Sequence, residues 1–317
     1  MGFDCLSVGI LVADHLCAPI ARLPEAGELV LADDLPLAIG GCAANAAIDL
    51  RRVDVNVGVI GCVGADIFGR FICETLAEAG IGTEGIRAVH DYPTSGTLII
   101  NVQGQDRRFI HTIGASAALR AGEIPWSLVS QSKVLYVGGY LLLKGLKPAE
   151  LADLFRRAHA AGVITVLDIV MPGPGEYLAQ LDPVLAETDV FLPNTDEAGS
   201  ITGQKDPVRQ AERFLSAGAK TVVITCGHEG TLLMSDRLRF RAGVYPTQFV
   251  GGTGAGDAFD AGYILGLARG DDPRRCLEWG SALGASCVRS ISATASVFTR
   301  PEAEAFIGKH PLEIREF

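Results

Sequence analysis

The sequence predicts an α/β fold in which helices cover both faces of a mostly parallel central β-sheet, with a small β-sheet lid at one edge. Three observations predict it. An aliphatic and β-branched run at residues 6–13 is typical of a buried strand. From residue 133 onward strands and helices alternate, which favours a parallel sheet. The segments at about 14–40 and 90–116 break this alternation, and we expect them to form the lid of a single domain, residues 1–317.

The elements of the first half follow from composition and spacing. Segment 27–41 is strand-like and bounded by Pro and Gly, and 95–114 resembles a hairpin, with two strands around "GQD". Apolar residues at helical spacing stop at Gly80, which marks a helix end. We therefore expect helices at 42–53 and 66–80, separated by a strand at 55–64.

The second half repeats the strand–helix rhythm more regularly. We expect strands at 133–139, 163–170, 189–193, 220–227 and 230–235. Helices are expected at 148–162, 254–269 and 273–289, and the last two are expected to close the chain.

Charge and cysteine usage exclude several classes of protein. A net charge of −10 disfavours a nucleic-acid or anionic membrane partner, although backbone N–H groups could still hold a small anion. The eight cysteines are scattered without a C-x-x-C pair, which indicates neither a disulfide framework nor a zinc site. No apolar stretch approaches the ~20 residues that span a bilayer. We expect a cytoplasmic protein with reduced thiols.

The stretch "GGTGAGDAFDAGY" at residues 251–263 carries the main chemical signal. Small residues from Gly254 to Gly256 leave the backbone accessible just before a predicted helix, whose first N–H groups attract an anion. Asp257 would lie beside that anion and could accept a proton from an attacking hydroxyl, which is the arrangement for phosphoryl transfer to an alcohol. A plain turn, with Asp257 complementing the helix dipole, stays open as the alternative. No P-loop motif occurs, and no dinucleotide fingerprint follows the first strand.

Two segments together resemble a known family. "TGAGDAFDAGY" (253–263) is similar to the C-terminal signature of the PfkB-type, ribokinase-like carbohydrate kinases, and "GGCAANAAIDLRRVDVNVGVIGCVGADIFG" (40–69) is similar to their N-terminal signature. The resemblance runs from the first strand to the last predicted helix. It implies a ribokinase-like three-layer αβα sandwich. It also implies an ATP-dependent phosphotransferase that acts on a hydroxyl, expected to be a primary one, of a small sugar or sugar-like substrate.

The resemblance also implies roles for residues on the substrate side. Asp257 matches the general base, and Asp14 matches an acid that binds substrate hydroxyls, for which a carboxylate suits a vicinal diol. The implied anion hole is Gly254, Ala255 and Gly256, and the implied substrate-facing turn is Gly40, Gly41 and Asn45.

A second group of residues matches the nucleotide side of the family. "LPNTDEA" (192–198) matches the N-x-x-E motif linked to Mg²⁺, where Glu197 would act through water because Mg²⁺ sheds its hydration reluctantly. Asn194 and Glu197 are also spaced as a capping box, and both interpretations can hold. Thr225, Gly227 and Gly230 also match ATP-binding positions, and Ser281 is expected to bind the nucleotide although it stands where many relatives carry an adenine-side Asn.

Some positions depart from the family pattern. Gly251–Gly252 replaces a common Asp–Thr pair linked to a monovalent-cation site, so potassium activation stays open. Cys42 stands where several relatives carry Lys, which weakens the case for an already phosphorylated substrate. In the lid, Arg107, Arg108 and His111 could face the sugar or the solvent, and the solvent-facing interpretation is favoured. Lids of this family often pair between subunits, which predicts a homodimer.

Three alternatives accompany the kinase hypothesis. One is a nucleoside kinase of the same family, and another is a sugar-binding regulator without turnover. The third, a dinucleotide-dependent dehydrogenase, is disfavoured by the missing glycine fingerprint. The sequence does not identify the sugar, because the side chains that distinguish the stereochemistry of sugar hydroxyls lie on the variable lid segments.

Overall fold

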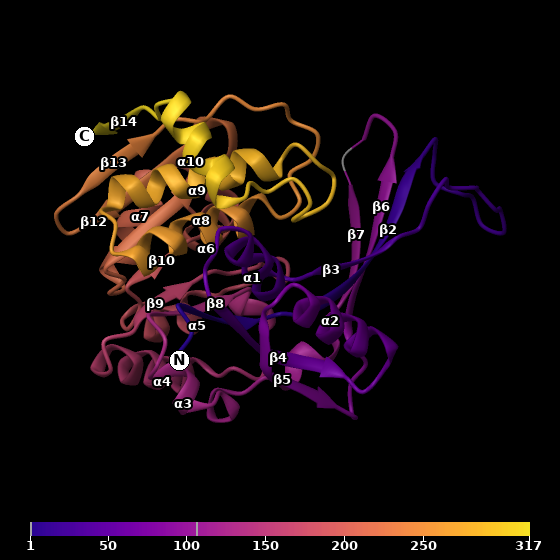
Figure 1. The fold of residues 1–317 in the computed structure, drawn as a ribbon, viewed down its shortest axis with the longest axis horizontal. Helices are drawn as coiled ribbons and strands as arrows, with labels where there is room; N and C mark the ends of the chain where they lie inside the picture. Colours follow the sequence, from indigo (N-terminus) through magenta and orange to yellow (C-terminus); the bar gives the residue numbers. More distant parts are fainter. Residues whose placement is uncertain (1, 106) are drawn as a thin grey trace.

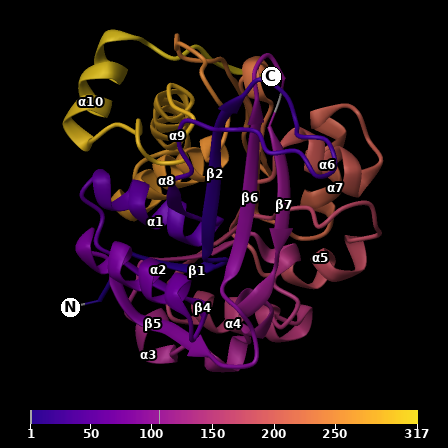
Figure 2. The ribbon, with the colours of Figure 1, turned by 90° about the vertical axis from the view of Figure 1, so that its right-hand side faces the viewer.

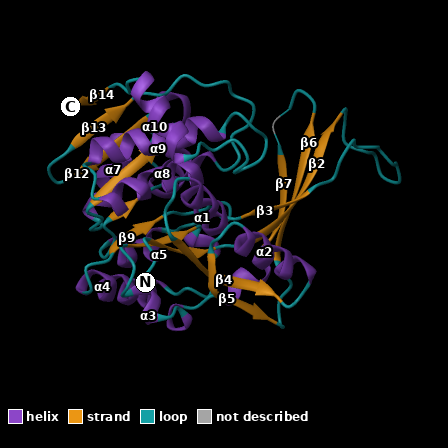
Figure 3. Cartoon of the chain, viewed as in Figure 1, coloured by secondary structure: helices purple, strands orange, loops and turns teal. Residues whose placement is uncertain are grey.

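Two β-sheets organise the protein in the computed structural model, which describes residues 2–105 and 107–317. A ten-stranded sheet carries the helices, and a four-stranded sheet stands apart on one side (Figures 1 and 3). In the part of the chain described, every helix is too short or too polar to span a lipid bilayer.

The large sheet is mostly parallel, as predicted. Its strand order is β14-β13-β12-β11-β10-β9-β8-β1-β4-β5. The parallel strands are β1 (Cys5–Gly9), β4 (Val57–Gly64), β5 (Gly82–Val89), β8 (Val134–Gly138), β9 (Ile164–Leu167), β10 (Val190–Phe191) and β11 (Thr221–Thr225). Three antiparallel strands extend one edge: β12 (Thr231–Ser235), β13 (Arg239–Ala242) and β14 (Ile314–Glu316).

Helices cover both faces of this sheet and create two apolar cores. The first layer contains α1 (Cys42–Arg52), α2 (Ile67–Glu78), α8 (Ala255–Arg269), α9 (Pro273–Cys287) and α10 (Arg300–Lys309). The second contains α3 (Trp126–Val129), α4 (Pro148–Ala160), α5 (Leu178–Leu185), α6 (Thr195–Thr202) and α7 (Pro207–Ser216). Along β8, Tyr136 enters the first core while Leu135 and Val137 enter the second, because successive strand residues face opposite sides.

The small sheet is built from the two segments that break the alternation. Its order is β3-β2-β6-β7, from β3 (Leu37–Gly40), β2 (Val12–Ile20), β6 (Ser95–Val102) and β7 (Arg108–Thr112). Figure 2 shows β2, β6 and β7 running side by side. The β6–β7 turn is at the predicted "GQD", whose Asp106 lies outside the described residues.

The structure corrects three predicted elements. The run 6–13 is not one strand, because the chain leaves the large sheet at Ile10–Leu11 and continues as β2 in the small one. The strand-like segment 27–41 is regular only in β3. The chain does not close with α8 and α9, since α10 and β14 follow; β14 is short and largely exposed, and backbone pairing with β13 holds it rather than a hydrophobic pattern.

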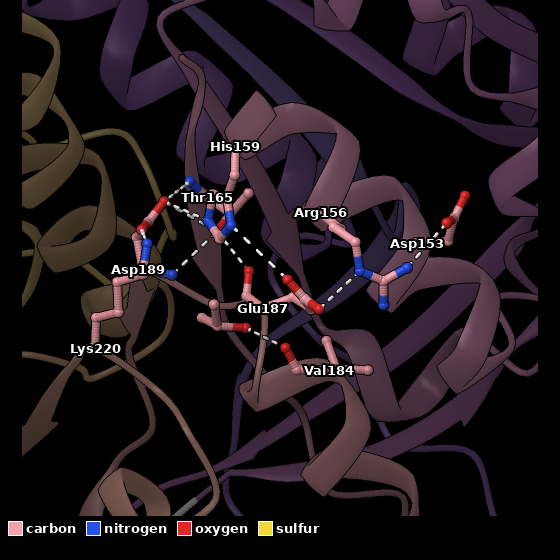
Figure 4. A network of polar contacts seen from close by, with 9 residues as sticks. Asp153, Arg156, His159, Thr165, Val184, Glu187, Asp189 and Lys220 are labelled. Carbon is pink, nitrogen blue, oxygen red and sulfur yellow. Dashed lines mark hydrogen bonds and ion pairs between the residues drawn. The ribbon is translucent and has the colours of Figure 1, made fainter. Parts of the chain in front are cut away.

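A polar network joins the helix layer to the amino ends of three parallel strands (Figure 4). Asp189 accepts hydrogen bonds from Lys220 Nζ at 2.7 Å and from the backbone N–H of Thr165 at 2.8 Å. His159 Nε2 lies 2.8 Å from the same carboxylate. These contacts fasten α4, β9, β10 and β11 to one another at the amino ends of the strands. The carboxyl ends of the same strands lie on the opposite side of the sheet.

Candidate active site

The start of α8 has the geometry of an anion site. Gly254 adopts a left-handed conformation with φ of 76°, and a β-carbon there would lie 2.5 Å from the carbonyl oxygen of Ala293. A β-carbon on Gly256 would meet nothing within 4 Å, so this position is open. No side chain caps the helix within the described residues. The N–H group of Ala255 donates to the carbonyl oxygen of Gly252 at 3.3 Å, whereas the next N–H groups, those of Gly256 and Asp257, are accessible to a ligand. Ala255 and Gly256 line the same cavity.

Asp257 lies in the first turn of α8 and is held by α1. The side-chain nitrogen Nδ2 of the buried Asn45 donates to Asp257 Oδ2 at 2.8 Å. Burial raises the pKa of Asp257, and the hydrogen bond from Asn45 opposes that rise. The carboxylate is thus more basic than a free aspartate and has a fixed orientation.

Asp14 approaches the same site from the small sheet. Its carboxylate packs on Gly40, where a β-carbon would lie only 2.0 Å from Asp14 Oδ2. Gly41 is also required, with φ of 90° and no room for a β-carbon beside Ile10. Burial raises the pKa of Asp14 to about 6, a hydrogen bond from Thr97 opposes this, and the negative charge of Asp257 adds to it. The structure therefore gathers the predicted substrate-side residues around Asp257.

Two neighbours of Asp257, Asp168 and Asp260, were not singled out from the sequence. Asp168 directly follows β9 and accepts a hydrogen bond from the backbone N–H of Gly139 at 3.0 Å. Asp260, one turn after Asp257, accepts a hydrogen bond from the buried Tyr136 hydroxyl at 3.0 Å. An aspartate at the carboxyl end of a parallel strand was the available signal for Asp168.

Cys42 completes an acidic cluster at the base of the site. Its Sγ and one carboxylate oxygen each of Asp168 and Asp257 all lie within 4.8 Å of one another. Burial raises the pKa of Asp168 well above its ordinary range, and the charges of Glu197 and Asp257 raise it further. The carboxylates thus repel one another, and a cation bound here would relieve that repulsion.

A cavity of about 870 Å³ brings the predicted nucleotide-side residues together. Its lining includes Asn194, Thr225, Gly227, Gly230, Gly256 and Ser281. Among the described residues, the Ser281 Oγ and the buried Tyr245 hydroxyl have no hydrogen-bond partner. Both residues line this cavity beside apolar ones such as Val244 and Pro246, which suits a flat heterocycle with polar edges.

Asn194 and Glu197 form the expected capping box. Asn194 Oδ1 accepts the backbone N–H groups of Asp196 and Glu197 at 3.0 and 2.9 Å, and Glu197 Oε2 accepts that of Asn194 at 3.0 Å. Burial raises the pKa of Glu197 to about 7, and the charge of Asp257 contributes to the rise. The second carboxylate oxygen of Glu197 takes no part in the box and fits a hydrated divalent cation.

The three lid residues differ: Arg108 and His111 are exposed, as predicted, whereas Arg107 is half-buried. Thr97 Oγ1 lies 3.1 Å from His111 Nδ1, and Thr97 is also the strand partner of Asp14, so His111 lies on the Asp14 side of the sheet. A β-carbon on Gly252 would lie 3.7 Å from Nη2 of Arg107, which places this guanidinium at the loop before α8. Arg108 instead donates to Gln105 and is exposed, as predicted.

Comparisons with known proteins agree with this geometry. The family described as "pfkB family carbohydrate kinase" matches residues 4–300. The ribokinase of Haemophilus influenzae is 27% identical over 306 residues, covering 95% of this chain and 97% of the relative. The ATP-dependent 6-phosphofructokinase of Thermoanaerobacterium thermosaccharolyticum is 25% identical over 296 residues, covering 92% and 89%.

Solved structures confirm the ribokinase-like fold. Arabidopsis thaliana ribokinase complexed with ribose and ATP superposes with a TM-score of 0.84 at 22% identity, covering 97% of this chain and 99% of that one. Ribokinase from Thermotoga maritima gives a TM-score of 0.82 at 24% identity, covering 96% and 99%. The three-layer sandwich predicted from the sequence is therefore correct.

Proposed function

This chain belongs to the pfkB family of ATP-dependent carbohydrate kinases, and from that premise we propose that it phosphorylates a primary hydroxyl of a small sugar or sugar-like substrate, with Asp257 as general base. One observation carries the proposal: the Asp257 carboxylate, oriented by Asn45, lies at the uncapped start of α8. A base and an anion site thus occur side by side, as phosphoryl transfer to an alcohol requires.

The proposed chemistry uses three groups in sequence. Asp14 accepts hydrogen bonds from the sugar and positions the reacting hydroxyl near Asp257. Asp257 removes the hydroxyl proton as the oxygen attacks the terminal phosphoryl group. The anion hole at Gly254, Ala255 and Gly256, in which Gly256 and Asp257 offer their N–H groups, stabilises the charge on the phosphoryl group in transit, and ADP leaves.

ATP fits the cavity lined by Thr225, Gly227, Gly230 and Ser281. The hydroxyls of Ser281 and Tyr245 would contact the adenine ring of ATP, and Gly256 would face the terminal phosphate. Glu197 would hold Mg²⁺ through water, and the ion would supply charge neutralisation for the phosphates.

The small sheet acts as a lid on a single domain, residues 1–317, in this proposal. Its Asp14 face covers the sugar and excludes water that would otherwise accept the phosphoryl group. The other face exposes Leu98 and Ile110, and Leu29, Leu31 and Leu35 are exposed in the connection to β3. Such an apolar surface supports pairing of two lids in a homodimer.

The test is ADP release with Mg²⁺ and ATP over a panel of free sugars, sugar phosphates and nucleosides. We expect Asp257→Asn to lower kcat by ~10²–10⁴, the usual contribution of a general base. Asp182→Asn, an exposed change on the other helix layer, is the matched control and should keep wild-type turnover. Turnover of Asp257→Asn close to wild type would refute the assignment. Preference for nucleosides, or wild-type ligand binding without ADP release, would favour the nucleoside kinase or the regulator.

A further inference from the structure

The cluster of Cys42, Asp168 and Asp257 has features that Mg²⁺ binding does not explain. Magnesium prefers oxygen ligands and keeps its waters, whereas this cluster offers a thiol. The cysteine is 7% exposed, and its position on the first turn of α1 directs the sulfur at two carboxylates from other elements. A soft thiolate with two hard carboxylates is a ligand set for Zn²⁺ and similar ions.

The three ligand atoms lie close to the spacing that a small ion requires. The three ligand atoms lie within 4.8 Å of one another. Zinc bonds of about 2.3 Å to sulfur and 2.0–2.2 Å to oxygen need ligand atoms roughly 3.3–3.7 Å apart. Gly138 and Gly139 at the end of β8 leave space for this cysteine, since a β-carbon on Gly138 would lie 2.8 Å from Cys42 Cβ.

A second observation is an unpartnered buried oxygen beside the cluster. Asn45 is 5% exposed and donates to Asp257, yet its Oδ1 has no hydrogen-bond partner among the described residues. This oxygen belongs to an amide that ends at the cluster, where a metal-bound water could donate to it. Meanwhile the backbone of Gly139 and the hydroxyl of Tyr136 already fix Asp168 and Asp260, so the supporting hydrogen bonds are in place.

The electrostatics also favour a cation. Asp168 and Asp257 bring two carboxylates to the buried Cys42 thiol, and the carboxylate of Asp260, held by Tyr136, adds to the mutual repulsion. A divalent cation relieves this repulsion, and binding would release the thiol proton to solvent without any change of oxidation state.

We propose that Cys42, Asp168 and Asp257 form a site for a thiophilic divalent cation of the zinc class, and that occupancy inhibits the enzyme by taking the carboxylate of Asp257. The inhibitory part rests on the proposed function, because it assumes that Asp257 is the base. The metal site itself does not, since it needs neither sugar nor ATP. The site would couple turnover to the free concentration of such an ion.

The direct test is spectroscopic and uses Co²⁺ as the probe on metal-free protein. Wild type should develop the near-ultraviolet charge-transfer absorption of a cobalt–thiolate bond, with one equivalent bound. Cys42→Ser, which keeps the size and removes the soft ligand, should lose it, and Asp168→Asn should weaken Co²⁺ binding about tenfold or more. Cys226→Ala, at a half-buried thiol outside the cluster, is the control and should keep the band. A band absent from wild type, or retained in Cys42→Ser, overturns the site.

The inhibitory role is tested separately with buffered Zn²⁺ under saturating Mg²⁺ and ATP. Zinc should inhibit wild type, and Cys42→Ser should raise the half-inhibitory zinc concentration about tenfold or more, as loss of one ligand does. Inhibition that is equal in both proteins overturns this role even if the cobalt spectrum stands. Wild type that binds Co²⁺ through Cys42 but phosphorylates no substrate would refute the proposed function and leave the metal site standing.

Discussion

Asp257 and Asp14 show how position decides the chemistry of a carboxylate. Both are aspartates in the third position of a regular element, β2 or α8, and both have raised pKa values because burial disfavours their charge. Asp257 receives a hydrogen bond from Asn45, whereas Asp14 receives one from Thr97 of the lid. The first is held by the rigid layer and the second by the element that we expect to move. The proposed base is therefore fixed, and the proposed substrate-binding acid is coupled to the position of the lid.

This difference predicts a pH dependence. The pKa of Asp14 is about 6, so the carboxylate is protonated below that value and can accept fewer hydrogen bonds from the sugar. We expect kcat/KM to fall as the pH drops through about 6, with the loss mainly in KM for the sugar. The measurement is a pH series of kcat and KM between pH 5 and about pH 8. In Asp14→Asn the KM for the sugar should be raised, and the fall of kcat/KM at acidic pH should disappear. If the fall stayed unchanged, another group would be its cause.

At the residue scale, sequence could predict the groups that sit in recognisable patterns. Asp257, Asn45 and Asp14 lie in signature segments or at a strand end, and the structure brings them together. Asp49 shows the limit of such patterns. It is fully buried on α1, and its carboxylate oxygens have no hydrogen-bond partner within the described residues. Nothing local distinguishes it from a surface acid, because its burial depends on the helices packed over it.

In the proposed mechanism, the lid contributes to both catalysis and substrate specificity. Its inner face carries Asp14, Thr97 and His111 in one row across three strands. Its tip brings Arg107 to the loop at Gly251–Gly252, where small residues leave room for the guanidinium. Arg107 also packs over Phe109, which stiffens the approach. The lid therefore contacts both the sugar side and the loop that leads into the anion site.

We expect Arg107→Ala to lower kcat about 10²-fold, because misplacing the lid against the anion site disturbs a geometry set within an ångström. Arg108→Ala is the matched control: it removes the same charge from the next residue, which is exposed and donates to Gln105, and should behave as wild type. Steady-state kinetics of both variants with the same sugar make the comparison. Equal losses in the two would indicate a general effect of lid charge rather than a contact made by Arg107.

Elements with a strong side-chain pattern could be predicted, and elements held by the backbone could not. Strands such as β4 and β8 are apolar throughout because helices cover both of their sides. β5, β13 and β14 have partly exposed, irregular patterns, and they are strands because a neighbour offers hydrogen bonds. The split between β1 and β2 was missed for a related reason, since the residues stay buried while the chain changes sheets.

On the scale of the whole molecule, polar groups gather at both ends of the parallel strands of the large sheet. At the amino ends, Asp189 is matched by Lys220, Thr165 and His159, so the charge is compensated (Figure 4). At the carboxyl ends, Asp168, Asp257 and Asp260 face one another. The contacts at the amino ends therefore stabilise the fold, whereas the carboxylates at the carboxyl ends repel one another, and a bound ligand can relieve that repulsion. Two signature segments far apart in the sequence predicted the site around Asp257. Nothing in the sequence predicted the Asp189 network at the amino ends of the strands.

The polar network of Asp189 at the amino ends of the strands predicts how the stability of the protein changes at acidic pH. Burial raises the pKa of Asp189, but hydrogen bonds from Lys220 and Thr165 and the neighbouring His159 outweigh it and hold the pKa below its ordinary value. A carboxylate whose pKa is lowered on folding stabilises the protein above its unfolded pKa, about 3.9, and that contribution is lost as the pH falls through the folded value. Asp189→Asn should thus lose about 1–3 kcal/mol at pH 7, and the difference from wild type should shrink below about pH 4.

Urea unfolding of both proteins at the two pH values measures this effect. Asp153→Asn is the control, since the Asp153–Arg156 pair is more than half exposed and lies at the rim of the same network. Its loss should stay within about 0.5 kcal/mol, as for most surface substitutions. If Asp189→Asn were as stable as Asp153→Asn at pH 7, the network would not hold the strands together. If its deficit persisted unchanged in acid, packing of the side chain rather than its charge would be the cause.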